Sequence, residues 1–538
     1  MNFTDEQIAI FEYAVKGPFN MIVEAVAGAG KTTTLVECVK RMPRDKRIFL
    51  LAHNKSTRDE LKNRINKKPE GEEVPDFDNV TILTLHGLGW RLFKEHFDET
   101  PTINENKYRN YINRNINEIA SDMYTSLSRA KKMLYRANVF DILDKARQNL
   151  KQSEKEIRKL GERKYGINFV ADEPHFIAKI IKWGAENRTE IDYQDLLYFP
   201  HYFGYFTKQY LADVVMLDEA QDASIAQLDV ISRCTKRNTR LFAFGDKDQM
   251  INNWCGATDE AFEMISDENL FRRPAVKLPL TVNHRCGKKI IEYAKQFVNN
   301  DIKPEDDAED GIVRHDVSLS EISEGDMVLC RNTYPLMDVY RKCVAAGKRV
   351  YFRGEGLGET LVQEADSVDC DTIAEVIINL KRRLIATWDF ITVSEGIDEK
   401  ESMVNPRVVS ILDTIRTMEN LPRTVKTKKD LAKFAQDMFS NEGRDGIQLS
   451  TIHRAKGLEA DNVFIICPSL VPSRLATLDW ELKEEQNLQY VMCTRAKHSL
   501  NFVSEKELAP HRAFTELNSL YKTLNDIRDE LSQIQWND

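Results

Sequence analysis

The sequence predicts an α/β protein with two parallel-sheet domains, each interrupted by a mostly helical insertion. The first observation is a series of ten short apolar runs, which are typical of strands buried on both faces of a sheet. The second is that helical patterns separate these runs, as in units that build a parallel sheet. The third is length, because 538 residues can form about three to four domains of ~150 residues.

Five runs in the first half of the chain predict the first sheet. They are Met21–Ala25, Ile48–Ala52, Val80–Thr84, Val214–Leu217 and Leu241–Phe244. Between the third and fourth runs the pattern is helical, for example over Tyr124–Arg136 and Val139–Leu160. We therefore expect a sheet domain from residues 1–86 and 191–275, with residues 87–190 as its helical insertion.

Five runs in the second half predict the second sheet. They are Met327–Cys330, Val350–Phe352, Ile447–Thr451, Val463–Ile466 and Leu500–Val503. Residues 356–441 do not show the residue pattern that is typical of strands, and they include a helical pattern over Cys370–Leu384. We expect a second sheet domain from residues 276–355 and 442–538, with residues 356–441 inserted and a helical tail at its end.

Composition excludes several classes of protein. No run of 18 or more apolar residues predicts a membrane span, and the acidic N-terminus does not resemble a secretory signal. The nine cysteines form no CxxC pair, so neither a zinc site nor a disulfide framework is expected, and a reducing compartment fits best. A net charge of −9 excludes binding of nucleic acid by bulk charge alone, but not a local basic channel.

Charge is distributed unevenly along the chain. Residues 101–190 contain 18 Lys and Arg against 12 Asp and Glu, so this segment is basic within an acidic chain. A solvated helical surface and a surface that contacts nucleic-acid phosphates both explain this excess. The composition leaves the two interpretations open.

A glycine-rich turn after the first run predicts a phosphate-binding loop. Residues Ala25 to Thr32 read AVAGAGKT, and a helix is expected to follow. Gly28 and Gly30 allow backbone N–H groups to face a phosphate at the positive end of that helix. Lys31 would reach the β- and γ-phosphates and the Thr32 hydroxyl would bind Mg²⁺, while Ala25 stands where the general pattern has glycine.

An acidic motif, Asp218 to Asp222 (DEAQD), follows the fourth run. Because ligands bind beyond the carboxyl ends of parallel strands, this motif should lie near the loop. Asp218 would hold Mg²⁺, and Glu219 would orient and deprotonate the attacking water. Together with the loop, the motif predicts nucleotide hydrolysis.

Nine motifs in order resemble those of the UvrD/Rep-type helicases of superfamily 1, including the F-box helicase branch. They are Phe3–Gln7, Ala25–Thr32, Leu51–Lys55, Thr84–His86, Asp218–Asp222, Gly245–Gln249, Asn283–Arg285, Thr451–Glu459 and Tyr490–Lys497. The resemblance implies two RecA-like P-loop domains, 1A and 2A, with insertion 1B at 87–190 and a reduced 2B at 356–441. Because no carboxylate-rich domain follows Arg495, we expect no fusion of a helicase with a nuclease.

The resemblance also implies roles for single residues. Gln7 would read adenine, Gln249 would sense the γ-phosphate, Glu459 would contact the ribose, and Arg285 and Arg495 would be arginine fingers from the second sheet. Such a finger contributes roughly 10³–10⁵ in rate. The implied catalytic residues are Lys31, Glu219, Gln249, Arg285 and Arg495, and the implied ATP-binding residues are Gln7, Ala25, Gly28, Gly30, Lys31, Thr32, Thr33, His284 and Glu459.

A single strand of nucleic acid is expected to run across the tops of both sheets. Trp254 would stack on a base, a contact of roughly 1–3 kcal/mol that tolerates any sequence. The other implied strand contacts are Asn54, Thr84, His86, Thr451 and His453. His284 replaces a common adenine-stacking tyrosine, Asn252 a second stacking aromatic, Cys255 a common arginine, and Gln486-Asn487 a common arginine pair.

The predicted function is an ATP- and Mg²⁺-dependent helicase or translocase that moves 3′ to 5′ on single-stranded and tailed duplex DNA. The direction follows from the resemblance alone. Alternatives are an ATPase that mainly displaces proteins from DNA, an RNA-directed motor of the same superfamily, and a P-loop switch without nucleic acid. Location in the cytoplasm, or in a eukaryotic nucleus, and a single-strand-binding or loader partner are further expectations.

Overall fold

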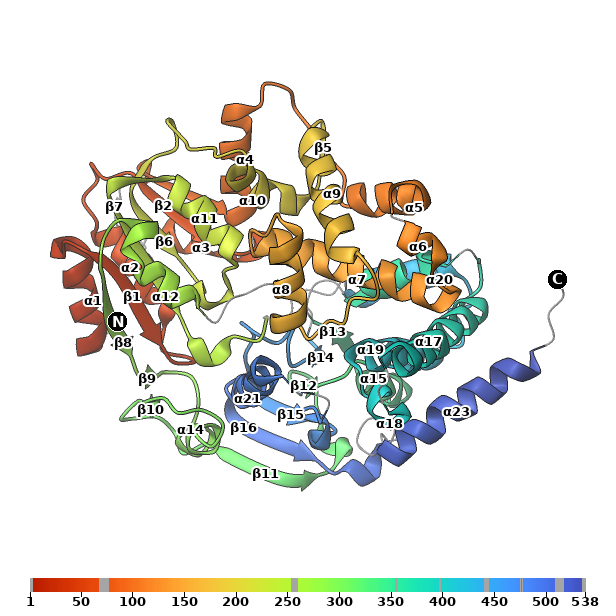
Figure 1. Cartoon of the computed structure of the whole chain (residues 1–538). Coiled ribbons are helices and arrows are strands. Elements are labelled where there is room, and N and C mark those ends of the chain that lie inside the picture. The colour runs from red at the N-terminus through yellow and green to blue at the C-terminus, as the bar shows by residue number, and fades with distance from the viewer. Residues whose placement is uncertain are drawn as a thin grey trace. The chain divides into compact units, whose positions relative to one another are not determined.

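The computed structural model describes residues 3–66, 77–120, 122–252, 260–353, 357–368, 370–395, 398–439, 445–474, 476, 478–508 and 517–534. The chain forms two compact units, Met1–Asn283 and His284–Asp538. Each unit contains a six-stranded sheet surrounded by helices (Figure 1). Every neighbouring pair of strands in both sheets is parallel, which confirms the predicted fold class.

The sheet of the first unit has the strand order β3-β2-β6-β7-β1-β8. Its strands are β1 (Asn20–Ala25), β2 (Ile48–Ala52), β3 (Val80–Thr84), β6 (Ala212–Leu217), β7 (Thr235–Gly245) and β8 (Ala275–Leu280). The five predicted strands are confirmed. The edge strand β8, which pairs with β1 and is followed by β9 (Val282–Asn283), is an addition to them.

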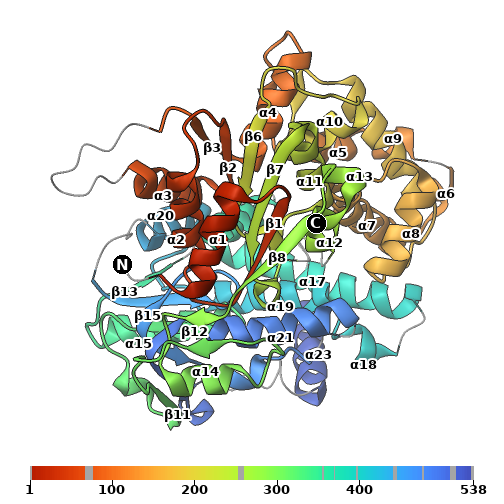
Figure 2. The same ribbon diagram turned by 90° about the vertical axis from the view of Figure 1, so that its left-hand side faces the viewer.

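Helices cover both faces of this first sheet. One face carries α1 (Asp5–Lys16), α2 (Lys31–Arg41) and α3 (Lys55–Asn66), which lie in front of the sheet in Figure 2. The other carries α4 (Leu85–His96), α10 (Tyr193–Tyr202), α11 (Ile225–Arg233), α12 (Ala261–Ser266) and α13 (Glu268–Phe271).

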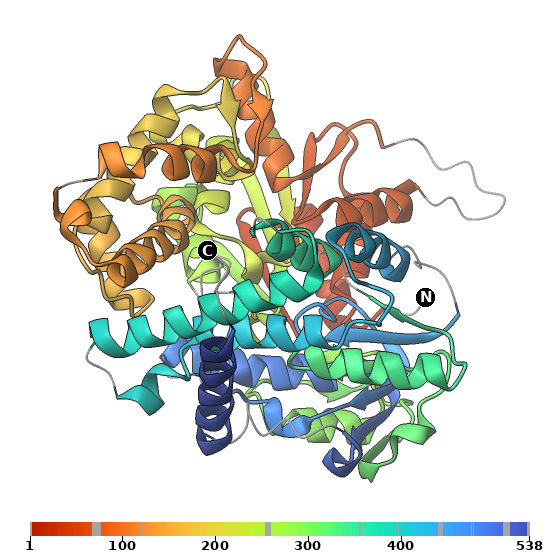
Figure 3. The ribbon, with the colours of Figure 1, turned by 90° about the vertical axis from the view of Figure 1, so that its right-hand side faces the viewer.

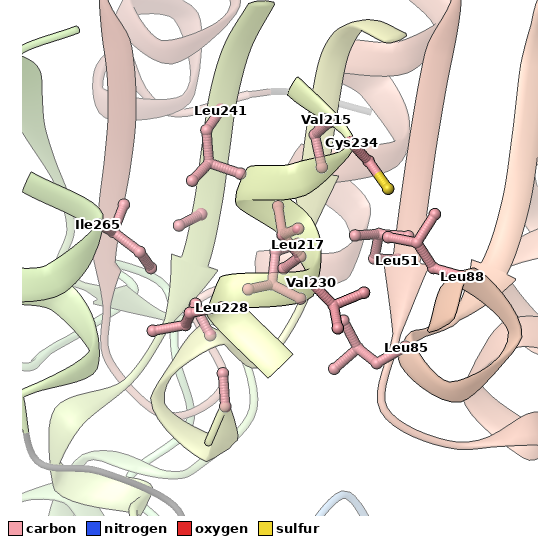
Figure 4. Packing of buried hydrophobic residues seen from close by; sticks show 14 of the residues in the cluster. Leu51, Leu85, Leu88, Val215, Leu217, Leu228, Val230, Cys234, Leu241 and Ile265 are labelled. Carbon is pink, nitrogen blue, oxygen red and sulfur yellow. The ribbon is translucent and has the colours of Figure 1, made fainter. Parts of the chain in front are cut away.

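Alternate strand residues form the core on the second of these faces. Val215 and Leu217 of β6 and Leu241 of β7 pack against Leu228 and Val230 of α11 (Figure 4). All five side chains are almost fully buried. Burial of apolar area contributes about 25 cal/mol per Å², so this layer stabilises the sheet that positions the site.

The insertion of the first unit is helical, as predicted. It contains α5 (Lys107–Ile119), α6 (Asp122–Ser126), α7 (Arg129–Gln148), α8 (Glu154–Lys164) and α9 (Glu173–Glu186), together with the short pair β4 (Thr102–Ile103) and β5 (Glu190–Ile191). Both predicted helices of the insertion are interrupted: Tyr124–Arg136 is broken where α6 ends at Ser126 and Ser128 caps α7, and Val139–Leu160 is broken after Gln148. Leu150 adopts a left-handed φ of 56°, and Ser153 starts α8 with a capping box.

A buried group of charges, here called the charge cluster, joins the insertion to α10. Lys107 and Arg147 of the insertion are each 1% exposed. The Lys107 ammonium donates to Asp195 at 2.8 Å, and the Arg147 guanidinium donates to both Asp192 and Asp195 at 2.7–2.9 Å. Two cations of the basic segment therefore neutralise internal aspartates and contribute nothing to a basic surface.

The sheet of the second unit has the strand order β11-β16-β15-β12-β14-β13. Its strands are β11 (Ile312–Val317), β12 (Met327–Cys330), β13 (Val350–Phe352), β14 (Ile447–Thr451), β15 (Ala460–Ile465) and β16 (Ala496–Val503). The flanking elements are α14 (Lys288–Ala294), α15 (Tyr334–Ala345), α21 (Asp479–Cys493) and the short strand β10 (Lys303–Pro304). The five predicted strands are again confirmed, and β11 is an additional edge strand.

The insertion of the second unit is also helical. It contains α16 (Leu357–Asp366), α17 (Ile373–Glu395), α18 (Glu399–Ser402), α19 (Pro406–Glu419) and α20 (Lys428–Phe439). The tail helix α23 (Leu517–Gln533) crosses α17 (Figure 3), where Lys381 donates to Glu530 at 2.9–3.0 Å. Asp413 of α19 accepts the N–H groups of Thr333 and Tyr334 at the start of α15, both at 3.3 Å. The finer division into 1A, 1B, 2A and 2B remains a prediction.

Candidate active site

The turn between β1 and α2 has the backbone of a phosphate-binding loop. Gly28 and Gly30 have φ values of 66° and 73°, in the left-handed region that suits glycine. Ala25 ends β1 as a buried residue, and α2 begins at Lys31. The positive end of α2 therefore faces the loop, where it favours an anion.

Lysine and threonine of this loop meet the acidic motif at the end of β6. The Lys31 ammonium lies 3.8 Å from a carboxylate oxygen of Glu219. The Thr32 hydroxyl donates to Asp218 at 3.4 Å, and Thr33 follows in the first turn of α2. The structure therefore brings together the four residues to which the sequence assigns phosphate binding, metal binding and proton transfer.

Asp218 is buried at the centre of the sheet edge. Burial, reinforced by the neighbouring Glu219 carboxylate, raises the pKa of Asp218 to about 7. A cation beside this carboxylate would favour its charged form. Because a carboxylate and a hydroxyl within hydrogen-bond distance are hard oxygen donors, the pair suits Mg²⁺.

Glu219 is held in an unusual conformation. Its φ of 50° lies in the left-handed region, and such a residue costs about 1–3 kcal/mol unless its surroundings fix it. The Gln221 side-chain amide donates to the Glu219 carboxylate, and the Gln221 amide oxygen accepts the Asp246 N–H at 3.0 Å. Gln221 therefore fixes the predicted general base.

The motif after β7 is also buried. Gln249 donates to the Asp246 carboxylate at 2.6 Å. Burial raises the pKa of Asp246 to about 6, which the Lys31 charge partly offsets. The predicted γ-phosphate sensor is thus tied to an aspartate that Lys31 also influences electrostatically.

Gln7 packs against the loop from the start of α1. Its amide oxygen accepts the Thr4 N–H at 3.0 Å in a capping box, and its amide nitrogen donates to Thr34 of α2 at 3.0 Å. The sequence pattern T-x-x-Q is a known signature of such a cap. The role of Gln7 as adenine reader stays a prediction.

In the second unit, the first predicted finger is paired with the predicted ribose contact. The Arg285 guanidinium lies 2.7 Å from Glu459 and donates to the Thr494 carbonyl at 3.1 Å. Lys497 contacts the other Glu459 oxygen at 2.9 Å. Although burial would raise it, Lys497 and Arg285 hold the pKa of Glu459 below its ordinary value.

The second predicted finger, Arg495, is buried inside this unit. Its guanidinium donates to the carbonyls of Val491 and Leu458 at 2.9 and 3.1 Å. His284 contacts Glu305 at 3.1 Å. In this conformation both arginines have protein partners, and their roles on a nucleotide stay predictions.

The predicted strand contacts of the first unit lie after β2 and β3. Asn54 is exposed and accepts the Thr57 N–H at 2.8 Å, while Thr84 caps α4. His86 lies edge-on to Tyr193, with ring centroids 5.9 Å apart. Burial and nearby His53 lower the pKa of His86, so it is a neutral donor.

In the second unit, Thr451 ends β14 and His453 follows it. Thr451 accepts the Arg454 N–H at 3.4 Å. Burial, with the charges of Arg331 and Arg454, lowers the pKa of His453 well below its ordinary value. The predicted stacking residue Trp254 and its neighbour Cys255 lie outside the described residues.

Comparisons with known proteins identify the family. Residues 4–269 match the UvrD/REP helicase N-terminal domain, and residues 377–507 match the UvrD-like helicase C-terminal domain. The chain belongs to the UvrD/REP helicase family. The predicted family is confirmed, and the predicted class of enzyme, an ATP-dependent DNA helicase, is that of its named relatives.

Two relatives in the UvrD/REP family span most of this chain. The F-box DNA helicase protein 1 of Schizosaccharomyces pombe is 24% identical over 92% of this chain and 57% of its own length. The ATP-dependent DNA helicase PcrA of Bacillus subtilis is 22% identical over 99% of this chain and 87% of its own length. The chain thus spans little more than half of the yeast relative.

The structure places three residues of this UvrD/REP chain in the site to which the sequence assigned no role. Asn283 is fully buried and donates to the Ala27 carbonyl of the loop at 2.7 Å. Gln221 fixes Glu219, and Tyr193 presents a ring that is 46% exposed beside His86. Asn283 and Gln221 stand inside motifs, whereas Tyr193 has no local signal because only the fold brings it to His86.

Two further findings concern metals and membranes. Among the residues that the structure describes, no three His, Cys, Asp or Glu side chains gather as a metal site would require. Across the same residues, no helix combines the length and the apolar character that a membrane crossing needs.

Proposed function

We propose that this chain is an ATP-driven motor that moves 3′ to 5′ along single-stranded DNA and opens tailed duplexes. The observation that carries the proposal is the meeting of Lys31 with Glu219, and of Thr32 with Asp218, at one edge of the first sheet. In a member of the UvrD/REP family this arrangement supports ATP hydrolysis coupled to movement.

The first unit supplies the groups for hydrolysis. The loop N–H groups and Lys31 bind the phosphates, and Thr32 and Asp218 would hold Mg²⁺. Bound Mg²⁺ would neutralise charge on the β- and γ-oxygens. Glu219 accepts the proton of the water that attacks the γ-phosphorus, and ADP leaves with the β–γ bridging oxygen.

The second unit supplies the proposed fingers, Arg285 and Arg495, and the proposed ribose contact, Glu459. Arg285 and Glu459 contact each other at 2.7 Å, so the proposed finger and the proposed ribose contact lie side by side in this unit. The residues proposed to contact the strand are Asn54, Thr84, His86, Thr451, His453 and Trp254. These roles rest on the family resemblance and, for Asn54, Thr84, His86, Thr451 and His453, on positions at or just after strand ends.

The first test measures ATPase rate with and without single-stranded DNA. Strand-dependent stimulation supports the motor, and its absence would favour a P-loop switch. Glu219→Gln should keep ATP binding and lose turnover, because an amide cannot accept the proton of water. Asp218→Asn is the matched variant, and it should lose Mg²⁺-dependent binding instead.

The second test compares duplexes with a 3′ tail, a 5′ tail or blunt ends at saturating ATP and Mg²⁺. Preferential opening of the 3′-tailed duplex supports the proposed direction, and preferential opening of the 5′-tailed duplex refutes it. Matched RNA substrates separate an RNA motor from a DNA motor. Removal of a bound protein with little unwinding would favour the protein-displacing ATPase.

A DNA motor implies a compartment that contains DNA, which is the cytoplasm of a bacterial or virus-infected cell or the nucleus of a eukaryote. A single-strand-binding or loader protein is the proposed type of partner. Pull-down with a tailed duplex as bait would test both the substrate and such a partner.

A further inference from the structure

The insertion of the second unit caps a helix that belongs to the sheet domain. Helix α15 follows β12, and its N-cap residue Thr333 has helical backbone angles (φ −81°, ψ −41°) instead of the extended ones from which a hydroxyl usually caps a helix. The Asp413 carboxylate of α19, 79–80 residues further along the chain, accepts the N–H groups of Thr333 and Tyr334, each at 3.3 Å. An anion at this end satisfies N–H groups that have no partner within the helix, and the helix dipole stabilises it.

Asp413 is fixed by the packing of its own helix. Leu412 and Ile415 beside it are fully buried, and α19 packs against both α15 and α17. Burial raises the pKa of Asp413, although the N–H groups of α15 and the Asn332 side chain favour the charged form. Because a desolvated carboxyl group is costly unless its hydrogen bonds are made, this contact holds the two helices in a defined arrangement.

The turn that Asp413 holds, residues 331–333, lies at the carboxyl edge of the second sheet. The last residue of β12 pairs with Thr451, the last residue of β14. The charge of Arg331 in this turn contributes to the lowered pKa of His453. The turn therefore borders Thr451 and His453, the two residues of this unit that we propose as contacts of the DNA strand.

A second carboxylate holds the same turn from α21. Glu485 is buried, and one of its oxygens accepts two N–H groups of the Arg331 guanidinium at 2.8 and 3.0 Å. The side chain of Arg331 is thus fixed by the sheet domain, whereas the main chain that follows it is fixed by Asp413. The insertion and the sheet domain hold this turn together.

We infer that Asp413 is a positioning residue, which holds the turn 331–333 in the conformation that presents Thr451 and His453 to a single strand of DNA. The inference rests on the proposed function, because it assumes that DNA contacts this edge. When the cap is lost, the turn leaves the binding-competent conformation, and the apparent Kd for DNA rises as the competent fraction falls. The insertion thereby supports strand binding by the sheet domain, whereas hydrolysis without DNA depends on other residues.

The test measures the Kd of Asp413→Ala for a fluorescent single-stranded oligonucleotide of mixed sequence by anisotropy. The Kd should rise about fivefold, which is the shift that the loss of a helix cap of typical strength gives. Basal kcat and KM for ATP without the oligonucleotide should stay as in wild type. Hydrogen exchange at the amides of Thr333 and Tyr334 should become faster. Asp413→Asn keeps one acceptor oxygen, so it should give a smaller rise in Kd.

Asp430→Ala is the matched control. Asp430 lies in the same insertion and also accepts two consecutive N–H groups, those of Lys426 and Thr427 at 3.1 and 2.9 Å, at the start of α20. Its loss should lower the melting temperature to a similar extent but leave the Kd and the exchange at α15 unchanged. If Asp413→Ala does not fold, Asp413→Asn is compared with Asp430→Asn, and only the first should raise the Kd.

Several results would overturn the inference. An unchanged Kd in a folded Asp413 variant, or the same rise in the Asp430 control, shows that Asp413 does not position this edge. A higher Kd without faster exchange at Thr333 and Tyr334 shows that Asp413 acts by another route than the cap. If the wild-type protein itself does not bind the oligonucleotide, the proposed function fails too, and this outcome is distinct from a wild type that binds and a variant that binds equally well.

Discussion

Replacing Gly245 by alanine should disrupt the hydrogen-bonded link between the proposed general base and the motif after β7. A methyl group at this position would lie 2.3 Å from the Gln221 amide oxygen and 2.8 Å from the ring of Phe262. Both neighbours are buried, so one of them must move. Overpacking costs about 1–3 kcal/mol. If the Asp246 N–H also loses its hydrogen bond to Gln221, the loss of stability grows by about 1–3 kcal/mol.

The expected loss of stability is therefore about 2–6 kcal/mol, or a fall of ~4–12 °C in melting temperature at roughly 2 °C per kcal/mol. ATP turnover should fall with it, because Gln221 no longer fixes Glu219. Thermal melting by circular dichroism and a steady-state ATPase assay measure the two effects. The double variant Gly245→Ala with Gln221→Ala should recover part of the stability but not the turnover.

Gly204→Ala is the matched control, because its methyl group meets nothing within 4 Å and only its φ of 67° opposes the change. It should lose about 1 kcal/mol and keep ATPase activity. If Gly245→Ala instead melts and hydrolyses ATP as wild type does, Gln221 does not fix the base, and the reasoning about this link is refuted.

Three other predictions concern charge. Arg147→Met should destabilise the first unit by about 3–5 kcal/mol in thermal or urea unfolding, because it leaves Asp192 and Asp195 buried with too little positive charge; a variant that melts as wild type does would contradict this. Burial raises the pKa of Asp246 to about 6 in the fold, so protonation of this carboxyl contributes to folding stability. That contribution is full below about pH 4 and is lost as pH rises through 6. The free energy of unfolding of Asp246→Asn should therefore gain on that of wild type by up to about 3 kcal/mol between pH 4 and 7, and parallel pH profiles would refute it. Reversing Lys131, Lys132 and Arg136 to Glu should reduce the salt dependence of DNA binding by roughly 0.7 in log–log slope per lost phosphate contact, whereas an unchanged slope would indicate a solvated surface.

Strands with a continuous apolar run could be predicted from the sequence, both inside the sheets and, for β3 and β13, at their edges. Every continuous apolar run is a strand of the structure. The two strands without such a run, β8 and β11, lie at the ends of their sheets. β8 contains Lys277 and Pro279, and β11 contains Arg314 and His315, because an edge strand faces water and tolerates polar residues and proline.

Motifs predicted the pairs that we propose as catalytic, but not the residues that hold them. The sequence identifies Lys31, Thr32, Asp218 and Glu219 because they come soon after apolar runs. The carboxyl ends of parallel strands meet at one edge of a sheet, where ligands bind. The pairing of Arg285 with Glu459 depends on contacts between segments far apart in sequence. The break after Gln148 depends on one left-handed residue, Leu150, which no propensity predicts.

The charge cluster bears on how freely the first insertion can be exchanged between relatives. Its anions, Asp192 and Asp195, stand at the start of α10, while its cations, Lys107 and Arg147, come from the insertion. Excising or grafting the insertion alone would strand two carboxylates inside the protein, at a cost of several kcal/mol per ion. Any chimera of this chain must therefore carry Asp192 and Asp195 along with the helices that neutralise them, so the exchanged segment has to extend past the insertion into the start of α10.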